Sequence, residues 1–165
     1  MKKIAIIKVR EYGEMVFELF ENEAPITVGN FEEYANKNFY DGLGFCRIVK
    51  DFVIQGGSPD NNIMTDSEHH IKGEFIENGV DNKLIHKRGA ISMARDDDYN
   101  TAGTQFFIVH KKAERLDKKY AAFGYMIEGF EVLDKIAEIK TLSKEEWNYP
   151  LSLPIIESIR VTDEV

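Results

Sequence analysis

The sequence predicts a mainly β fold, in which an antiparallel sheet curls into a barrel and two helices cover its open ends. Short apolar runs recur along the chain as strand candidates, whereas apolar residues at helical spacing occur in only two segments. Most connections are too short for the crossover that parallel strands require. At 165 residues, of which 43% are hydrophobic, the chain can bury one core, so we expect a single domain over residues 1–165.

The N-terminal part predicts a β-hairpin followed by a helix. Residues 4–9 and 15–20 would form the two strands, with Gly13 in the turn between them. Pro25 suits a first helical turn, and apolar residues recur from there at helical spacing. These apolar residues are Val28, Phe31, Tyr34 and Ala35.

The remaining elements are mostly strands. A turn at 40–44 leads into a second hairpin over 45–57, and the polar segment 58–88 predicts a loop with one short strand at 71–75. Further strands are predicted at 90–94, 104–109, 121–127 and 155–161, and a second helix at 130–139. The loop 141–154 contains the only tryptophan of the chain, Trp147.

Charge and composition restrict the class of partner. The formal net charge of −8 would repel nucleic acids and anionic membranes, which favours a protein, peptide or small-molecule partner. No segment approaches the roughly 20 apolar residues that span a bilayer, and the apolar run before Lys8 is too short for a secretion signal. The single cysteine, Cys46, fits a reducing compartment. We therefore expect a cytoplasmic protein that binds neither nucleic acid nor membrane.

The hairpin FCRIVKDFVIQGG, residues 45–57, places a cation, Arg47, and an amide, Gln55, in two apolar strands. A strand arginine usually lies on the solvent face with its stem on apolar neighbours. A two-residue turn would pair Arg47 with Ile54, whereas a three-residue turn over 50–52 would pair Arg47 with Gln55, on the same face as Val53. The second register would form a recognition surface beside Phe52, but the residues alone leave both registers open.

The strand TQFFIV raises a similar question. If Phe106 faces the core, Gln105 and Phe107 face the other way, and an exposed phenylalanine beside a glutamine indicates a binding surface. The alternative is a barrel wall that is buried on both faces.

Other polar residues do not form a recognisable reactive site. The histidines lack the spacing of metal ligands, and the acidic run 96–98 lacks the spacing and glycine of a calcium loop. No phosphate-binding loop, nucleophile elbow or acid/base pair of carboxylates occurs. The sequence therefore predicts neither a metal nor a cofactor.

The chain resembles the cyclophilin-type peptidyl-prolyl cis-trans isomerases over nearly its whole length. The segments that carry the resemblance, in family order, are LFENEAPITVGNF, FYDGLGFCRIVKDFVIQGG, IKGEF, GAISMAR, TQFFIV, LDKKYAAFG and EGFEVLDKI. The resemblance implies a closed eight-stranded antiparallel β-barrel capped by two α-helices. It also implies that Arg47 and Gln55 share a face, and so the three-residue turn.

The resemblance further implies a site for proline-containing peptides and unfolded proteins. Arg47 would be the catalytic guanidinium, and Gln55 would orient it and contact the substrate backbone. The proline pocket would be lined by Phe52, Val53, Phe107, Leu116 and Tyr120, and the groove for the residues that precede proline by Ala94, Arg95 and Gln105.

Three positions depart from the usual family pattern. Val53 stands where methionine is usual, Tyr120 where histidine is more common, and Arg115 where tryptophan is often found. Because a flexible cation replaces an indole at Arg115, we expect a cyclosporin-type ligand to bind only weakly.

Three functions remain to be compared. An active prolyl isomerase that assists protein folding is the leading hypothesis, and rapid X-Pro exchange that depends on Arg47 would support it. A proline-peptide binding module or holdase with little turnover would bind peptides without accelerating exchange. A barrel that binds a small anion through its arginine would bind its ligand regardless of proline in competing peptides. No long apolar helix face is left over, so we expect a monomer.

Overall fold

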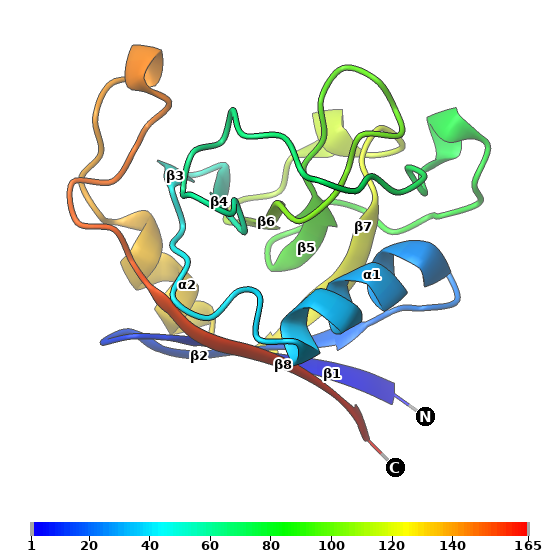
Figure 1. Cartoon of the computed structure of the whole chain (residues 1–165), viewed down its shortest axis with the longest axis horizontal. Helices are drawn as coiled ribbons and strands as arrows, with labels where there is room; N and C mark the ends of the chain where they lie inside the picture. Colours follow the sequence, from blue (N-terminus) through cyan, green and yellow to red (C-terminus); the bar gives the residue numbers. More distant parts are fainter. Residues whose placement is uncertain (1, 165) are drawn as a thin grey trace.

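The computed structural model describes residues 2–164, in which eight strands form one sheet and two α-helices pack against it. The strands are β1 (Lys2–Val9), β2 (Gly13–Leu19), β3 (Arg47–Val49), β4 (Val53–Gly56), β5 (Ala90–Met93), β6 (Phe106–Val109), β7 (Ala122–Glu128) and β8 (Ile156–Glu164). The helices are α1 (Pro25–Asn36) and α2 (Phe130–Ala137), as Figure 1 shows. Within the described residues, no helix has the length and apolar character to cross a membrane.

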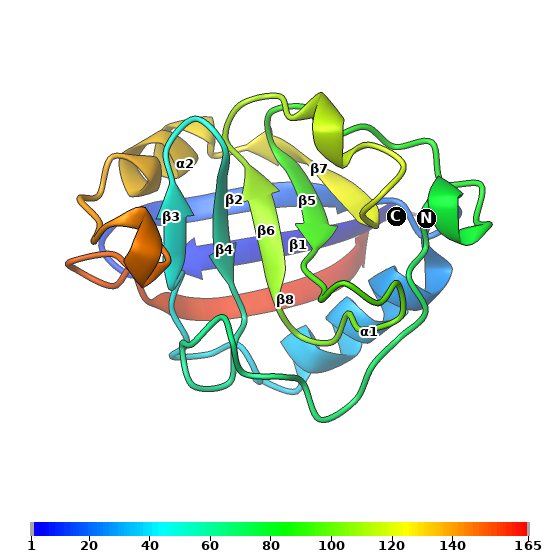
Figure 2. The same cartoon turned by 90° about the horizontal axis from the view of Figure 1, so that it is seen from above.

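The strands form a strongly curved antiparallel sheet in the order β3-β4-β6-β5-β7-β2-β1-β8. In Figure 2 the strands β3, β4, β6 and β5 cross over β2, β1 and β8, and β7 connects the two groups because it pairs with both β5 and β2. The core lies between these two groups. The antiparallel sheet and the two helices are therefore confirmed.

The prediction of a closed barrel is wrong. Across residues 2–164, no strand pairing joins β3 to β8, so the sheet is an open half-barrel with these strands as its edges. The segment between α2 and β8 runs along the β3 edge instead, where the backbone N–H of Ile48 donates to the carbonyl oxygen of Asn148 at 3.2 Å. Because this segment takes the hydrogen-bonding position beside β3, β8 does not close the barrel there.

The two helices cover different parts of the curved sheet. Helix α1 packs beside β8, and α2 lies near β2, β3 and β4 (Figure 2). Phe31 of α1 reaches the centre of the core, with its ring centroid 5.5 Å from those of Tyr40 and Phe106 and 5.1 Å from that of Phe123. The apolar helical spacing seen in the sequence therefore marks the face that is buried.

The predicted strand at 71–75 is not formed. Only one isolated bridge, between Ile71 and Ala102, occurs in this segment. Its buried carboxylate, Glu74, instead accepts hydrogen bonds from the backbone N–H groups of Ile26 (3.2 Å) and Thr27 (2.6 Å), at the N-terminus of α1. Tertiary capping of a helix thus replaces strand pairing here.

The hairpin register that brings Arg47 and Gln55 together is confirmed. Arg47 pairs with Gln55, Ile48 with Ile54 and Val49 with Val53 across a three-residue turn over 50–52. The central residue of the turn, Asp51, has a φ of +63°, which an aspartate tolerates better than most residues. Its backbone N–H donates to Nδ1 of His110 at 3.0 Å, which ties the turn to the end of β6.

Candidate active site

A groove of about 630 Å³ lies over the face of the sheet formed by β3, β4 and β6. Nine of the ten residues singled out from the sequence line it: Arg47, Phe52, Val53, Gln55, Ala94, Arg95, Phe107, Leu116 and Tyr120. The tenth, Gln105, lines a smaller pocket of about 60 Å³ that also includes Gln55, Ala94 and Arg95. These residues come from four separate stretches of the chain, 47–55, 94–95, 105–107 and 116–120, and are gathered at one concave surface.

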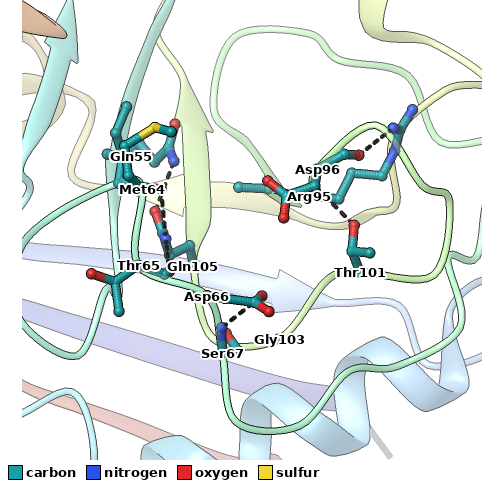
Figure 3. A pocket seen from close by; sticks show the side chains of 12 residues that line it. Gln55, Met64, Thr65, Asp66, Ser67, Arg95, Asp96, Thr101, Gly103 and Gln105 are labelled. Carbon is teal, nitrogen blue, oxygen red and sulfur yellow. Dashed lines mark hydrogen bonds between the residues drawn. The ribbon is translucent and has the colours of Figure 1, made fainter.

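A chain of side-chain amides holds the Arg47 guanidinium. Nη1 of Arg47 donates to Oε1 of Gln55 at 3.2 Å, and Nε2 of Gln55 donates to Oε1 of Gln105 at 3.0 Å. Nε2 of Gln105 in turn donates to the carbonyl oxygens of Ile63 and Thr65, each at 3.2 Å, as Figure 3 shows for the Gln105 end. Because the two carbonyls accept only, they fix the direction of both amides and therefore aim an acceptor at Arg47.

Partial burial lowers the pKa of the Arg47 guanidinium. Desolvation disfavours the charged form, but an arginine starts from so high a pKa that it stays protonated in proteins. The groove therefore presents a permanent cationic donor in a partly dry environment.

An apolar pocket adjoins this donor. Val53, Phe107 and Leu116 are buried and pack with the partly buried Phe52 and Tyr120 in a cluster separate from the main core. The strand β6 explains the separation, since Phe106 points into the main core and Phe107, on the other face, into this cluster. Both faces of β6 are therefore largely buried, and Phe107 faces the groove.

A buried histidine supports the pocket from behind. The ring of His86 stacks on Phe107 with centroids 5.9 Å apart. Its Nδ1 lies 3.0 Å from Oδ1 of Asp117 and its Nε2 lies 2.9 Å from Oγ of Ser92. Burial lowers the pKa of His86, and the Asp117 carboxylate only partly opposes this effect. A neutral imidazole fits the packing against Phe107.

Arg95 lies at the groove, but its guanidinium supports the fold. Nε and Nη2 donate to the carbonyl oxygen of Lys119 at 3.1 and 2.7 Å, and Nη1 to that of Asp96 at 2.9 Å. The guanidinium carbon also lies 4.5 Å from the ring centroid of Tyr120. Arg95 therefore joins the loop that follows β5 to the segment around Tyr120. Figure 3 shows Arg95 next to Asp96 in this loop.

Arg115 lies against the outer side of Phe52. Its guanidinium carbon lies 4.3 Å from the ring centroid of Phe52, within the range of a cation–π contact. Arg115 is exposed, and it lines a shallow pocket of about 330 Å³ on the outer side of Phe52 rather than the groove itself.

Sequence reasoning missed one side of the groove. The residues that complete the lining are Ile63, Met64, Asp96, Asp97, Asp98 and Trp147. They lie on three loops, so no strand periodicity marks them. One signal in the sequence could have found them: a tryptophan and a methionine occur in otherwise polar segments. Both side chains are exposed in the structure, Trp147 to 52% and Met64 to 66%.

Within residues 2–164, no three His, Cys, Asp or Glu side chains gather in a way that could hold a metal ion. The groove offers a fixed guanidinium beside an apolar pocket, with amides along one side. Such a site can bind a small apolar ring and place a hydrogen-bond donor next to it.

Comparisons with known proteins identify what this chain is similar to. The family model described as cyclophilin type peptidyl-prolyl cis-trans isomerase/CLD matches residues 4–161. A peptidyl-prolyl cis-trans isomerase from Acinetobacter baylyi is 39% identical over 134 residues, which cover 78% of this chain and 69% of the relative. The crystal structure of a cyclophilin type peptidyl-prolyl cis-trans isomerase from Cryptosporidium parvum matches with a TM-score of 0.89 at 27% identity, covering 100% of both chains. A crystal structure of that protein in the presence of the dipeptide Ala-Pro has a TM-score of 0.87 at 28% identity, covering 98% of this chain and 99% of the other.

Proposed function

The chain belongs to the family of cyclophilin-type peptidyl-prolyl cis-trans isomerases, which catalyse rotation about X-Pro bonds, and we propose that Arg47 is the catalytic residue of this chain. The observation that carries this assignment is the guanidinium held by Gln55 at the edge of the pocket formed by Val53, Phe107 and Leu116. Proline would bind in this pocket, and its amide nitrogen would then lie within reach of Arg47.

The chemistry of amide rotation explains why one donor is sufficient. Rotating the bond costs roughly 18–20 kcal/mol because twisting breaks the resonance between nitrogen and carbonyl. In the twisted state the prolyl nitrogen regains its lone pair, so a donor aimed at it binds the transition state better than either planar ground state. By analogy with oxyanion-hole donors, such a contact contributes about 3–4 kcal/mol.

The supporting residues have separate roles in this proposal. Gln55 and Gln105 orient the guanidinium, so that it is in place before the amide twists. Phe52 and Tyr120 complete the apolar walls that hold the proline ring, while the preceding carbonyl rotates. Ala94 and Gln105 would border the residue before proline, and Arg95 would keep the loop next to them in place.

The proposed substrates are X-Pro bonds in exposed or unfolded protein segments. The groove is open along the surface, which admits an extended chain more readily than a folded one. A cyclosporin-type ligand would bind weakly, because the Arg115 side chain lies against Phe52 where an indole is usual in the family.

The test is cis-trans exchange of a short proline peptide, measured by NMR with wild type and Arg47→Ala. We expect Arg47→Ala to lower kcat/KM by about two to three orders of magnitude, which corresponds to the 3–4 kcal/mol above. Arg47→Lys should recover only part of the loss, because an ammonium lacks the planar fork that Gln55 holds.

Arg115→Ala is the matched control, since it removes a cation near the pocket that is not part of the amide chain. It should leave exchange close to the wild-type rate. Equal, rapid exchange in wild type and Arg47→Ala would exclude Arg47 from the mechanism. Peptide binding without accelerated exchange would instead indicate a binding module.

A further inference from the structure

Trp147 is the one large aromatic residue at the groove to which neither the fold nor the proposed mechanism assigns a role. It is the only tryptophan of the chain, it is 52% exposed, and it lines the same groove as Arg47. An indole left half in solvent forfeits apolar burial that most tryptophans obtain. Its indole is therefore available to a ligand that binds in the groove.

The backbone holds Trp147 in an unfavourable conformation. Both Trp147 (φ +60°) and Asn148 (φ +51°) adopt the left-handed region, which residues other than glycine, asparagine and aspartate rarely occupy. The N–H of Trp147 donates to the carbonyl oxygen of Lys144 and the N–H of Asn148 to that of Ser143, both at 3.0 Å. A strained but well-bonded position of this kind is typical of functional sites.

The strand edge then fixes this turn next to the catalytic guanidinium. The carbonyl oxygen of Asn148 accepts a hydrogen bond from the N–H of Ile48, the residue that follows Arg47 in β3. The 3₁₀-helix Lys144–Glu146 and the loop around it are therefore a structured extension of the sheet (Figure 2). Trp147 is presented by this extension as a fixed part of the groove wall.

The strand order indicates which part of a peptide would reach Trp147. Ala94 and Arg95 directly follow β5, whereas Trp147 lies beside β3, and β4 and β6 separate the two. The residues before proline are assigned to the Ala94 side, so a chain that leaves the proline pocket continues toward the opposite side, at β3. The side chain that follows proline would thus lie near Trp147.

We propose that Trp147 is a specificity-determining residue that binds the side chain directly after proline and favours aromatic and large apolar side chains there. The inference rests on the proposed isomerase function and deepens it. An indole face stacks on aromatic rings and covers aliphatic groups, and about half of the Trp147 surface is free for such a contact.

The experiment compares peptides of sequence Ala-Ala-Pro-X, with X as Phe, Leu, Gly or Asp, by NMR exchange. Trp147→Asn removes the indole but keeps a residue that tolerates the left-handed backbone, and Trp147→Tyr keeps an aromatic ring. Leu151→Asn is the matched control, because Leu151 is 64% exposed and follows in the same loop but is not among the residues that line the groove.

Wild type should process the Phe peptide roughly five- to tenfold better than the Gly peptide, as kcat/KM. Trp147→Asn should lower the Phe-to-Gly ratio of kcat/KM to about one. Trp147→Tyr should restore most of the preference, and Leu151→Asn should retain it in full. An unchanged Phe-to-Gly ratio in Trp147→Asn, with exchange still dependent on Arg47, would overturn the inference and leave the proposed function intact.

Indole fluorescence supplies a second readout that does not require turnover. Because the chain has one tryptophan, a change in emission on adding peptide reports on Trp147 itself. The Phe peptide should change the emission more than the Gly peptide does, including in Arg47→Ala. Equal changes in emission with both peptides, or no change with either, would contradict the inference. This result does not depend on turnover, so it can be read even if the protein does not accelerate exchange.

Discussion

At the scale of single residues, the direction of each hydrogen bond determines what the groove can do. The carbonyls of Ile63 and Thr65 can only accept, so Gln105 must turn its amide nitrogen toward them. Gln55 is then forced to present its oxygen to Arg47. Two backbone carbonyls in a loop thereby determine the orientation of a guanidinium on a strand, two side chains away.

The buried His86 should make folding sensitive to mild acid. Burial lowers its pKa below the ordinary value of about 6.5 that applies in the unfolded chain. Between these two values the unfolded state binds more protons, so the free energy of unfolding falls as the pH falls below about 6.5. For one proton, the free energy of unfolding changes by up to about 1.4 kcal/mol per pH unit in this range. The dependence flattens below the pKa of the folded state.

Urea unfolding between pH 7.5 and 5 would check this expectation. His86→Gln should lose stability at pH 7.5, because it disturbs the contacts with Phe107 and Asp117, but it should show a smaller drop between pH 7.5 and 5. The exposed His69, changed to Gln, is the control and should follow wild type. Parallel pH curves for wild type and His86→Gln would show that His86 is not the titrating group.

At the scale of elements, the sequence predicts whatever depends on local periodicity. The alternation in β2, the helical spacing from Pro25 and the parity of the β3–β4 hairpin all depend on residues a few positions apart. The register needed the family resemblance, because two turn lengths fit the same residues. The segment 71–75 has an alternating pattern too, but its Glu74 is used 47 residues away at α1, which no local pattern reveals.

Glu74 should therefore stabilise α1. The residue before the helix, Ala24, has no side chain that could accept a hydrogen bond, and the Glu74 carboxylate replaces a local cap. Its Oε1 also accepts from the hydroxyl of Thr27 at 2.6 Å. Removing a buried acceptor leaves these donors unsatisfied, so we expect Glu74→Ala to lower the free energy of unfolding by about 2–3 kcal/mol.

Chemical denaturation would measure the loss. Glu74→Gln should lose less, because its amide oxygen still accepts a hydrogen bond although the charge that favours a helix N-terminus is gone. The exposed Glu68, changed to Ala, should change stability by no more than about 0.5 kcal/mol. The folded Glu74→Ala protein should catalyse cis-trans exchange of a proline peptide at the wild-type rate, since Glu74 does not line the groove. A loss no larger than that of Glu68→Ala would refute the capping role.

At the scale of the whole molecule, the open sheet explains how the groove acquires its second wall. A closed barrel would pair β3 with β8, and the carbonyl of Asn148 would then have no place beside Ile48. The segment before β8 occupies this edge instead and places Trp147 in the same groove as Arg47. This arrangement was not predictable from the sequence, since it depends on which of two distant segments pairs with a three-residue edge strand.

The net charge of the molecule should also influence which peptides it processes. With a formal charge of −8 and with Asp97 and Asp98 at the groove, the surrounding potential should concentrate cationic peptides and repel anionic ones. The test uses two peptides that share an Ala-Ala-Pro-Phe core. One carries two Lys residues several positions from the core, and the other carries two Glu residues at the same positions. At an ionic strength of about 0.01 M, where the Debye length is roughly 30 Å, kcat/KM should be at least about tenfold higher for the Lys peptide. At about 1 M the screening length falls to roughly 3 Å, and the two values should converge.

Asp97→Asn with Asp98→Asn should remove more of the preference than Glu157→Gln with Glu164→Gln on β8, because both pairs change the net charge equally but only the first lies at the groove. A preference for the Lys peptide that persists in high salt would indicate a direct contact instead, and equal values at low salt would show that the charge of the molecule does not act on its substrates.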